Sequence, residues 1–304
     1  MKRKYITLMV TAAIAFSQTG VFAKEYTPFA DTNESYMNVL KSCEILEGFE
    51  DNTFRGDKTL TRAEAVKMLQ GIMYYPQPDW DYSERESPFV DIAKNHWAFG
   101  AIVNCHTSRM INGFEDNTFR PDELVTEEQF VKMAVCRLGY EDISKIEGYP
   151  QGYVNRASML GLCEEATDKP ATREYAASIL YKMLSAPLLE VVGYVLDNGV
   201  MVPEFKTKEQ GATIALGLFQ VKATFSKGDA LTIVPTEIIA QDTERYNMGV
   251  YLPNLLTVGE AAEVQLGYEN ILDNFKEGDE VYMYLRCEED EETDNATLTL
   301  LYCE

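Results

Sequence analysis

The chain has 304 residues, enough for about two domains, and its 46% hydrophobic and 25% charged residues are typical of a globular protein. It has 49 acidic against 27 basic residues, a net charge of −22, and such a surface repels nucleic acids and anionic lipids. The composition therefore argues against nucleic acid as a partner.

The first 23 residues have the pattern of a secretory signal peptide. Three basic residues at positions 2–4 precede an apolar run over 6–16, and small residues allow cleavage near Ala23. The apolar run is too short for a membrane-spanning helix. We expect a secreted protein with no transmembrane segment, and if it stays on the cell, non-covalent contacts must hold it there.

An identical octapeptide, GFEDNTFR, occurs at Gly48–Arg55 and again at Gly113–Arg120. An exact repeat at a spacing of 65 residues indicates duplicated structural units. Two phenylalanines flank an Asp-Asn turn in each copy, so we expect them to hold a short loop onto the protein body. We expect Gly48 and Gly113 to end the preceding helices. No metal-ligand spacing follows the acidic pair Glu50-Asp51 of the octapeptide, so no metal site is predicted.

A capped helix is predicted after each octapeptide. Thr61 and Thr126 each precede Glu or Gln by three residues, which is the pattern of a capping box. A third helix with the same apolar register begins after Thr172, where the octapeptide has decayed. A unit of this size cannot bury its apolar stripe alone, so we expect the units to stack on one another. The predicted units are 24–78, 79–142 and the degenerate 143–187.

These units resemble the S-layer homology domain over roughly residues 26–186. The motifs that support the resemblance are Pro-Phe-x-Asp at 28–31 and 88–91, Trp97, Ile-x-Gly-Phe at 111–114 and Thr-Arg-Ala-Glu at 61–64. The resemblance implies a three-repeat, pseudo-trimeric helical bundle. It also implies non-covalent attachment to a bacterial cell wall, through a pyruvylated secondary wall polysaccharide or peptidoglycan that lies in grooves between the repeats.

The residues expected to bind the wall polysaccharide follow from this resemblance and from helix chemistry. Arg62 and Arg173 occupy first helical positions, where a cation opposes the helix dipole. We interpret each as a carboxylate clamp beside free helix amides, the alternative being a surface arginine paired with an acid. Glu127 replaces this arginine after the second octapeptide, and Trp97 either stacks on a sugar or belongs to the core. The expected binding residues are Arg62, Arg173, Trp97, Asp31, Asp91, Gly48 and Gly113.

Beyond Leu189 the pattern changes to short alternating strands bounded by Gly, Asp and Asn. We predict a small antiparallel β-sandwich or barrel over 188–304, which makes the chain an α + β multidomain protein. The acidic run Glu288–Asp294 is predicted to be a solvated hairpin loop. The predicted strands are 189–196, 199–205, 212–225, 230–239, 246–252, 262–266, 280–287 and 296–303.

The β-rich half has no histidine, since His96 and His106 are the only two in the chain. A histidine-ligated zinc site and a Ser-His-Asp triad are therefore excluded from that half. We predict a non-catalytic cell-surface protein, without a cofactor, that displays its β-domain and has self-association in a surface layer as a further option. The alternative is a wall-anchored carbohydrate-active hydrolase that uses a pair of carboxylates.

Six cysteines leave two alternatives, three disulfides or buried thiols. No two of them form a CxxC pair, which argues against a zinc or redox motif. We favour buried thiols over a disulfide framework. The six are Cys43, Cys105, Cys136, Cys163, Cys287 and Cys303.

Overall fold

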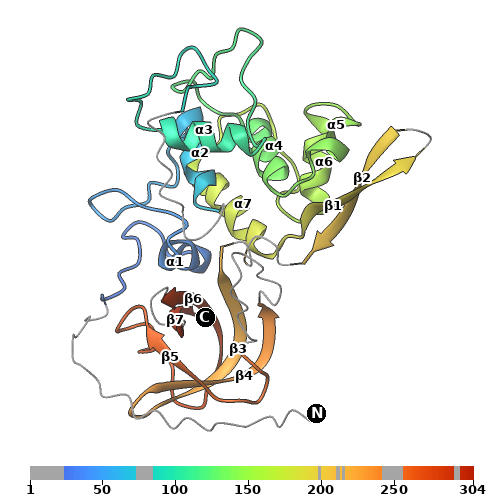
Figure 1. Ribbon diagram of the computed structural model, residues 1–304. Coiled ribbons are helices and arrows are strands. Elements are labelled where there is room, and N and C mark those ends of the chain that lie inside the picture. The colour runs from blue at the N-terminus through green and yellow to red at the C-terminus, as the bar shows by residue number, and fades with distance from the viewer. Residues whose placement is uncertain are drawn as a thin grey trace.

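A computed structural model describes residues 24–72, 85–197, 200–209, 213, 216–241, 256–290 and 295–304. The predicted signal peptide over 1–23 and the predicted strand over 246–252 lie outside these residues. The described chain has a helical body at one end and a five-stranded barrel at the other, and a two-stranded hairpin projects from the side (Figure 1).

Three of the helices in the described chain begin where the capping pattern predicts. The hydroxyls of Thr61, Thr126 and Thr172 each accept a hydrogen bond from the third helical amide, and Glu64 and Gln129 complete two capping boxes. No helix in the described ranges is long and apolar enough to cross a membrane. The helices are α1 (Ser35–Ser42), α2 (Arg62–Gln70), α3 (Phe99–Thr107), α4 (Glu127–Arg137), α5 (Glu141–Lys145), α6 (Gln151–Met159) and α7 (Arg173–Ser185).

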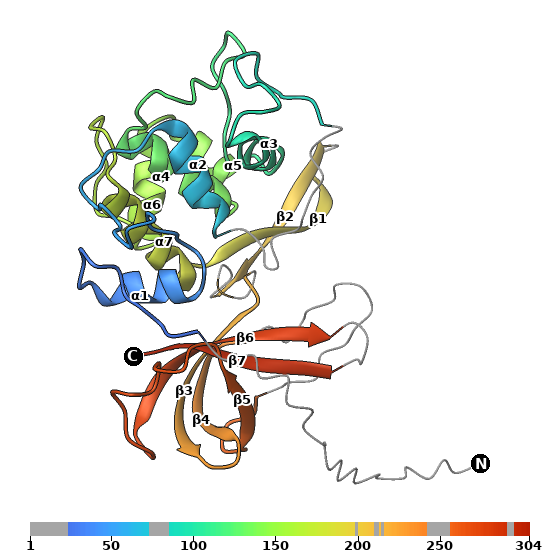
Figure 2. The ribbon, with the colours of Figure 1, turned by 90° about the vertical axis from the view of Figure 1, so that its left-hand side faces the viewer.

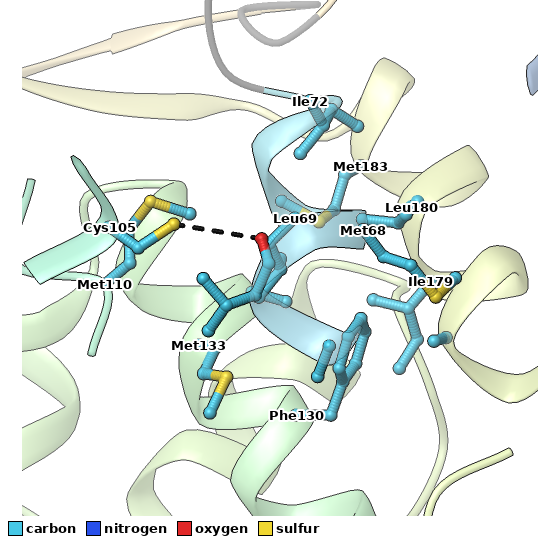
Figure 3. Close-up of a cluster of buried hydrophobic side chains, with 14 of the residues drawn as sticks. Met68, Leu69, Ile72, Cys105, Met110, Phe130, Met133, Ile179, Leu180 and Met183 are labelled. Carbon is cyan, nitrogen blue, oxygen red and sulfur yellow. Dashed lines mark hydrogen bonds between the residues drawn. The ribbon is translucent and has the colours of Figure 1, made fainter. Parts of the chain in front are cut away.

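The capped helices α2, α4 and α7 meet in one core. Side chains of α2 lie between those of α4 and those of α7, and Leu69, Phe130 and Ile179 are fully buried there (Figure 3). Burial of each such side chain stabilises the folded state by about 1.5–3 kcal/mol. Because these helices come from distant parts of the chain, the core that they share ties all three predicted units together.

A closed ring of backbone hydrogen bonds joins the segments that precede these helices. The Leu60 amide donates to the Ala171 carbonyl at 2.9 Å, the Ala171 amide donates to the Val125 carbonyl at 2.9 Å, and the Val125 amide donates to the Leu60 carbonyl at 3.0 Å. Each segment is therefore held by the next, and the last by the first.

The strands of the second half form two separate sheets. β1 and β2 make an antiparallel hairpin, while the other five close into a barrel in the order β3-β4-β5-β7-β6. Of the two predicted alternatives, sandwich or barrel, the five strands form the barrel. The prediction that all of its strands pair antiparallel is wrong, because β5 and β7 run parallel. The strands are β1 (Leu188–Asp197), β2 (Val200–Lys208), β3 (Leu218–Lys227), β4 (Leu231–Ala240), β5 (Ala262–Leu266), β6 (Glu280–Asp290) and β7 (Asn295–Cys303).

Most predicted strand boundaries shift by one to three residues, and two of the differences have a clear cause. The strand expected over 212–225 begins only at Leu218, after Gly217 has taken a positive φ of 67°. The acidic segment expected to be a loop is partly strand, because the ladder between β6 and β7 continues to the Asp290–Asn295 pair. Backbone pairing therefore outweighs the like charges of this segment.

Polar contacts attach the barrel to the helical body. Arg286 of β6 is buried, and its Nη2 donates to the Cys43 carbonyl at 2.9 Å while its Nη1 lies 2.8 Å from the Glu44 carboxylate. Near the start of the described chain, the Tyr26 amide donates to the Asn270 side chain at 2.8 Å. The two parts therefore meet in a specific arrangement.

All six cysteines are thiols in the structure, and five of them are buried. Burial raises the pKa of Cys105 and of Cys136 to about 12. We expect the folded protein to react slowly with a thiol reagent at neutral pH, and the unreduced protein in denaturant to titrate six thiols. A titration near zero would instead demonstrate the disulfide framework.

Candidate functional site

Each octapeptide forms a loop that an upstream aspartate holds in place. The Asp31 carboxylate accepts hydrogen bonds from the amides of Phe54 and Arg55, both at 2.7 Å. Asp91 makes the same two bonds in the second copy, at 2.8 and 2.7 Å. Desolvation opposes ionisation of Asp31, but the backbone amides outweigh it and lower the pKa of this carboxyl group. Both aspartates, expected to contact polysaccharide, are therefore engaged by the loop backbone.

Replacing Asp31 by Ala should reduce the free energy of unfolding at pH 7 by about 1 kcal/mol, because two amides lose a charged but exposed acceptor. A carboxyl group with a lowered folded pKa stabilises above its unfolded pKa, about 3.9, and this contribution is lost as pH falls through the folded value. In urea titrations the difference between wild type and variant should shrink below about pH 4. Asp122→Ala, at an exposed aspartate after the second loop, is the control. Equal stability of wild type and Asp31→Ala at pH 7 would contradict this role.

One phenylalanine of each loop is a core residue, as predicted. Phe54 and Phe119 are buried. Their rings pack against Phe29 and Phe89, with ring centroids 5.4 Å apart in both pairs. These two phenylalanines therefore fix the loops to the helical body.

The other phenylalanine of each loop, Phe49 or Phe114, is only half-buried, so the prediction that both phenylalanines hold the loop is half right. The guanidinium of Arg55 lies 3.9 Å from the Phe49 ring centroid, and that of Arg120 lies 3.8 Å from the Phe114 centroid. Each of these rings is stacked with a cation and lines a groove, where it is accessible to a ligand.

The expectation that Gly48 and Gly113 end the preceding helices is wrong. Helices α1 and α3 end earlier, where Glu44 and Arg109 take positive φ values of 58° and 57°. The glycines are needed because a Cβ at Gly48 would lie 2.5 Å from the Phe29 ring, and one at Gly113 would lie 2.3 Å from the equivalent ring. Their role in the structure is close packing.

The two predicted clamp arginines reach across to an octapeptide loop. Arg62 of α2 is 5% exposed, and its Nε donates to the Phe119 carbonyl at 2.8 Å. Arg173 of α7 is 8% exposed, and its Nε donates to the Phe54 carbonyl at 2.8 Å. The arginine of α2 thus fastens the second loop, and the arginine of α7 fastens the first.

The helix amides beside these arginines are occupied, so the expectation of free amides is wrong. The Arg62 amide donates to the Glu123 carbonyl at 2.8 Å, and the Ala63 amide donates to the Pro121 carbonyl at 3.0 Å. The first two amides of α4 and of α7 are occupied in the same way. The neighbouring segment supplies these carbonyls, so only the arginine side chain of each predicted clamp remains as a candidate for anion binding.

Neither Arg62 nor Arg173 has a carboxylate within 4.0 Å in the described part of the chain, which contradicts the alternative of a surface ion pair. Burial lowers the pKa of both arginines, although a guanidinium stays protonated in proteins. Glu123 and Asp91 act on Arg62 from beyond 4.0 Å, and Glu64 and Asp31 act on Arg173 in the same way, so burial is only partly offset. A carboxylate in direct contact with either guanidinium would offset it further.

Groove 1 is a cavity of about 390 Å³ between the first octapeptide loop, α2 and the Arg173 side chain. Trp97 also lines it and is 63% exposed, so the alternative that this tryptophan belongs to the core is wrong. Its ring stacks on His96 with centroids 5.8 Å apart. Groove 1 therefore combines a buried cation with an exposed aromatic face. Three carboxylate residues also line it: Glu44, Glu47 and Glu64.

Groove 2 is a cavity of about 190 Å³ that includes Arg62 and Phe114. Lys132 and Tyr149 line it too, with the lysine Nζ 5.6 Å from the tyrosine ring centroid. No acidic residue lines groove 2 among the described residues. It is therefore the more cationic of the two grooves.

The grooves bring together five of the seven predicted site residues. Gly48, Trp97 and Arg173 line groove 1, while Arg62 and Gly113 line groove 2. The two predicted aspartates line neither groove. Sequence reasoning missed Lys132 and Tyr149 as site residues, because no repeated motif marks the lysine. The tyrosine lies in the segment 147–150, in which the sequence offers only a remnant of the Pro-Phe-x-Asp motif.

At the equivalent position of α4 the charge is reversed, as the sequence indicates. The Glu127 carboxylate accepts hydrogen bonds from the amide and the hydroxyl of Thr167, at 3.0 and 2.8 Å. An acid therefore fastens the third segment where arginines fasten the two octapeptide loops, and it adds no cation there.

Comparison with known proteins identifies the family of the repeated units. The sequence model of the S-layer homology domain matches residues 28–66 and 88–131. A cell surface protein of Thermoanaerobacter kivui is 26% identical over 222 residues, which cover 70% of this chain and 29% of the relative. A surface layer protein of Brevibacillus choshinensis is 25% identical over 222 residues, 71% of this chain and 18% of the relative. An amylopullulanase of Thermoanaerobacterium thermosulfurigenes is 27% identical over 196 residues, 57% of this chain and 10% of the relative. The chain spans less than a third of the length of these curated relatives.

Proposed function

Because this chain carries the S-layer homology domain, we propose that it is a non-catalytic cell-surface protein anchored non-covalently to a bacterial cell wall. The relatives named cell surface protein and surface layer protein support this proposal. The observation behind it is a pair of grooves, each with a largely buried arginine and no carboxylate within 4.0 Å of its guanidinium in the described chain. Such grooves suit a polymer that carries acidic groups.

We propose a pyruvylated secondary wall polysaccharide as the ligand. Its carboxylate would lie against Arg62 and Lys132 in groove 2, and against Arg173 in groove 1. Sugar rings would stack on Phe114 and Tyr149 in one groove and on Trp97 in the other, because exposed aromatic faces offer apolar contact with hydrogen-bonding edges nearby. Four of the predicted site residues would act indirectly, by holding the octapeptide loops in the shape that forms the grooves. They are Asp31, Asp91, Gly48 and Gly113.

We also propose that the three units, 24–78, 79–142 and 143–187, form a pseudo-trimeric bundle. The closed ring of hydrogen bonds through Leu60, Val125 and Ala171 supports this arrangement, although the family match covers parts of only the first two units. Residues 188–304 would be displayed as a second domain, and a signal peptide cleaved near Ala23 would direct export. Peptidoglycan and a second copy of the chain are the other proposed partners.

A wall-anchored carbohydrate-active hydrolase is the second candidate, because one relative is named an amylopullulanase. Such an enzyme needs two carboxyl groups about 5–10 Å apart in a concave site. Both grooves lie in the helical body, and no barrel residue lines either of them. Release of reducing sugar from isolated cell walls by the purified protein would favour this candidate.

Binding to isolated cell walls tests the proposal. We expect the purified protein to sediment with intact walls and to stay in solution with walls from which the secondary polysaccharide has been extracted. Equal sedimentation with both preparations would overturn the polysaccharide as the ligand. Sedimentation with neither would overturn attachment to the wall.

A further inference from the structure

The β1–β2 hairpin exposes seven large apolar side chains. It projects from the protein body, with β1 following directly after α7 (Figures 1 and 2). An isolated two-stranded hairpin is marginally stable in water, and contiguous exposed apolar patches mark interaction sites. The hairpin is therefore a candidate interaction site. Its exposed apolar residues, 38–71% accessible, are Val191, Val192, Tyr194, Val195, Leu196, Met201 and Val202.

The two outer edges of the hairpin differ. β2 contains Pro203, which has no N–H group, and the charged residues Glu204, Lys206 and Lys208, features that discourage pairing with a further strand. β1 has neither proline nor charge from Val191 to Leu196, and among the described strands it pairs only with β2. The edge of β1 is therefore the one able to accept a strand.

A bulge interrupts β1 between Val191 and Gly193, but it does not remove this edge. Beyond the bulge, Gly193–Asp197 pairs with Val200–Glu204 in one continuous register. A regular segment with unpaired backbone groups on its outer side thus remains. Main-chain hydrogen bonds along such a segment are the usual basis of strand addition.

We propose that the strand added to this edge is β1 of a second copy of the chain, so that two hairpins form a four-stranded antiparallel sheet. Antiparallel pairing about a two-fold axis at Val195 places the regular segment Gly193–Asp197 opposite itself, so that Asp197 faces Gly193 and no two acidic residues lie opposite each other. The net charge of −22 repels a second copy at long range. An uncharged strand that projects from the body is the place where two copies meet with least repulsion.

This interface is separate from the wall-binding grooves. No hairpin residue lines groove 1 or groove 2, so a dimer keeps its grooves open. The two associations also respond to salt in opposite ways. Raised ionic strength screens the repulsion between two acidic copies and strengthens the dimer, whereas it weakens an arginine–carboxylate contact.

Sedimentation velocity of the full chain over a range of concentrations tests the proposal, with two double variants that add the same charge. Val195→Lys/Leu196→Lys alters β1, and Met201→Lys/Val202→Lys alters the cross-strand partners of the same residues on β2. Wild type should dimerise, more tightly at higher salt. In the β1 variant the dimer dissociation constant should rise at least about tenfold, because each copy brings two lysines to one short shared edge. In the β2 variant it should change less than about threefold.

Three outcomes would overturn the inference. One is a wild-type chain that stays monomeric at every concentration and salt. Another is an equal loss of dimer in both variants, which would indicate apolar contact without pairing of β1. The third is a β1 variant that dimerises like wild type. Wall binding, measured on the same samples, is expected to be unchanged in both variants, so a failed anchor and a failed dimer are distinguishable.

Discussion

The double variant Arg62→Ala/Arg173→Ala is expected to lose binding to cell walls. Each single substitution should weaken binding by about 1.5–3 kcal/mol, roughly 10- to 150-fold, because a charged hydrogen-bonding contact to the polymer disappears. Raised salt should weaken wild-type binding more than binding by the single variants. The measurement is the amount of protein that sediments with walls over a concentration series.

The same substitutions should also lower the free energy of unfolding. Helix-dipole reasoning alone predicts a neutral or favourable effect, because each arginine is a cation at a helix start. The structure reverses this expectation, since the Nε atoms of Arg62 and Arg173 donate to the carbonyls of Phe119 and Phe54. Loss of these largely buried bonds should cost about 1–3 kcal/mol each in urea titrations.

Two control variants separate binding from stability. Lys132→Gln removes a cation from groove 2 without removing a bond to a loop carbonyl, so it should weaken binding and leave stability nearly unchanged. Glu127→Ala should leave wall binding unchanged and lower stability, because Thr167 loses its acceptor. If the folded double arginine variant binds walls like wild type, the arginines are not the clamps.

Replacing Phe119 by Ala should destabilise the protein by about 3–5 kcal/mol. The ring is fully buried, packs on Phe89 and lies 4.7 Å below the Arg62 guanidinium, so its loss leaves a cavity under the second loop. Thermal unfolding should shift to a clearly lower temperature. Wall binding should fall as well, because groove 2 loses its support.

Phe114→Ala is the matched comparison from the same octapeptide. This ring is half-buried and stacks on Arg120 at the groove, so its loss should cost less than about 1 kcal/mol of stability but still weaken wall binding. A similar destabilisation by the two substitutions would contradict the division between a core ring and a groove ring.

The sequence predicts local features of this fold well, because their causes are local. A capping box needs only residues three apart, and all three capped helices begin where Thr61, Thr126 and Thr172 place them. Alternation likewise locates β5 at Ala262–Leu266. The order of the barrel strands depends on pairing between distant segments, so the parallel contact of β5 with β7 could not be foreseen.

Contacts between distant segments also limit what the sequence predicts of the candidate site. Sequence places Arg62 at a helix start, but the carbonyls that occupy the neighbouring amides come from Glu123 and Pro121, about 60 residues away. Gly113 is a similar case, because its neighbour in space is the ring of Phe89, which lies outside its own local sequence. Trp97 is exposed against the usual tendency of tryptophan to be largely buried, and only the structure shows this.

The ring through Leu60, Val125 and Ala171 also bears on how such a protein can evolve. An open stack of repeats has two ends, so gene duplication can lengthen it by one copy at a time. Here every amide and carbonyl of the ring already has its partner, and a fourth segment would have to break one bond before making two. Growth by single duplications is therefore blocked, and the copy number is set by geometry. Divergence of the third segment, whose octapeptide has decayed, is tolerated as long as its backbone still closes the ring.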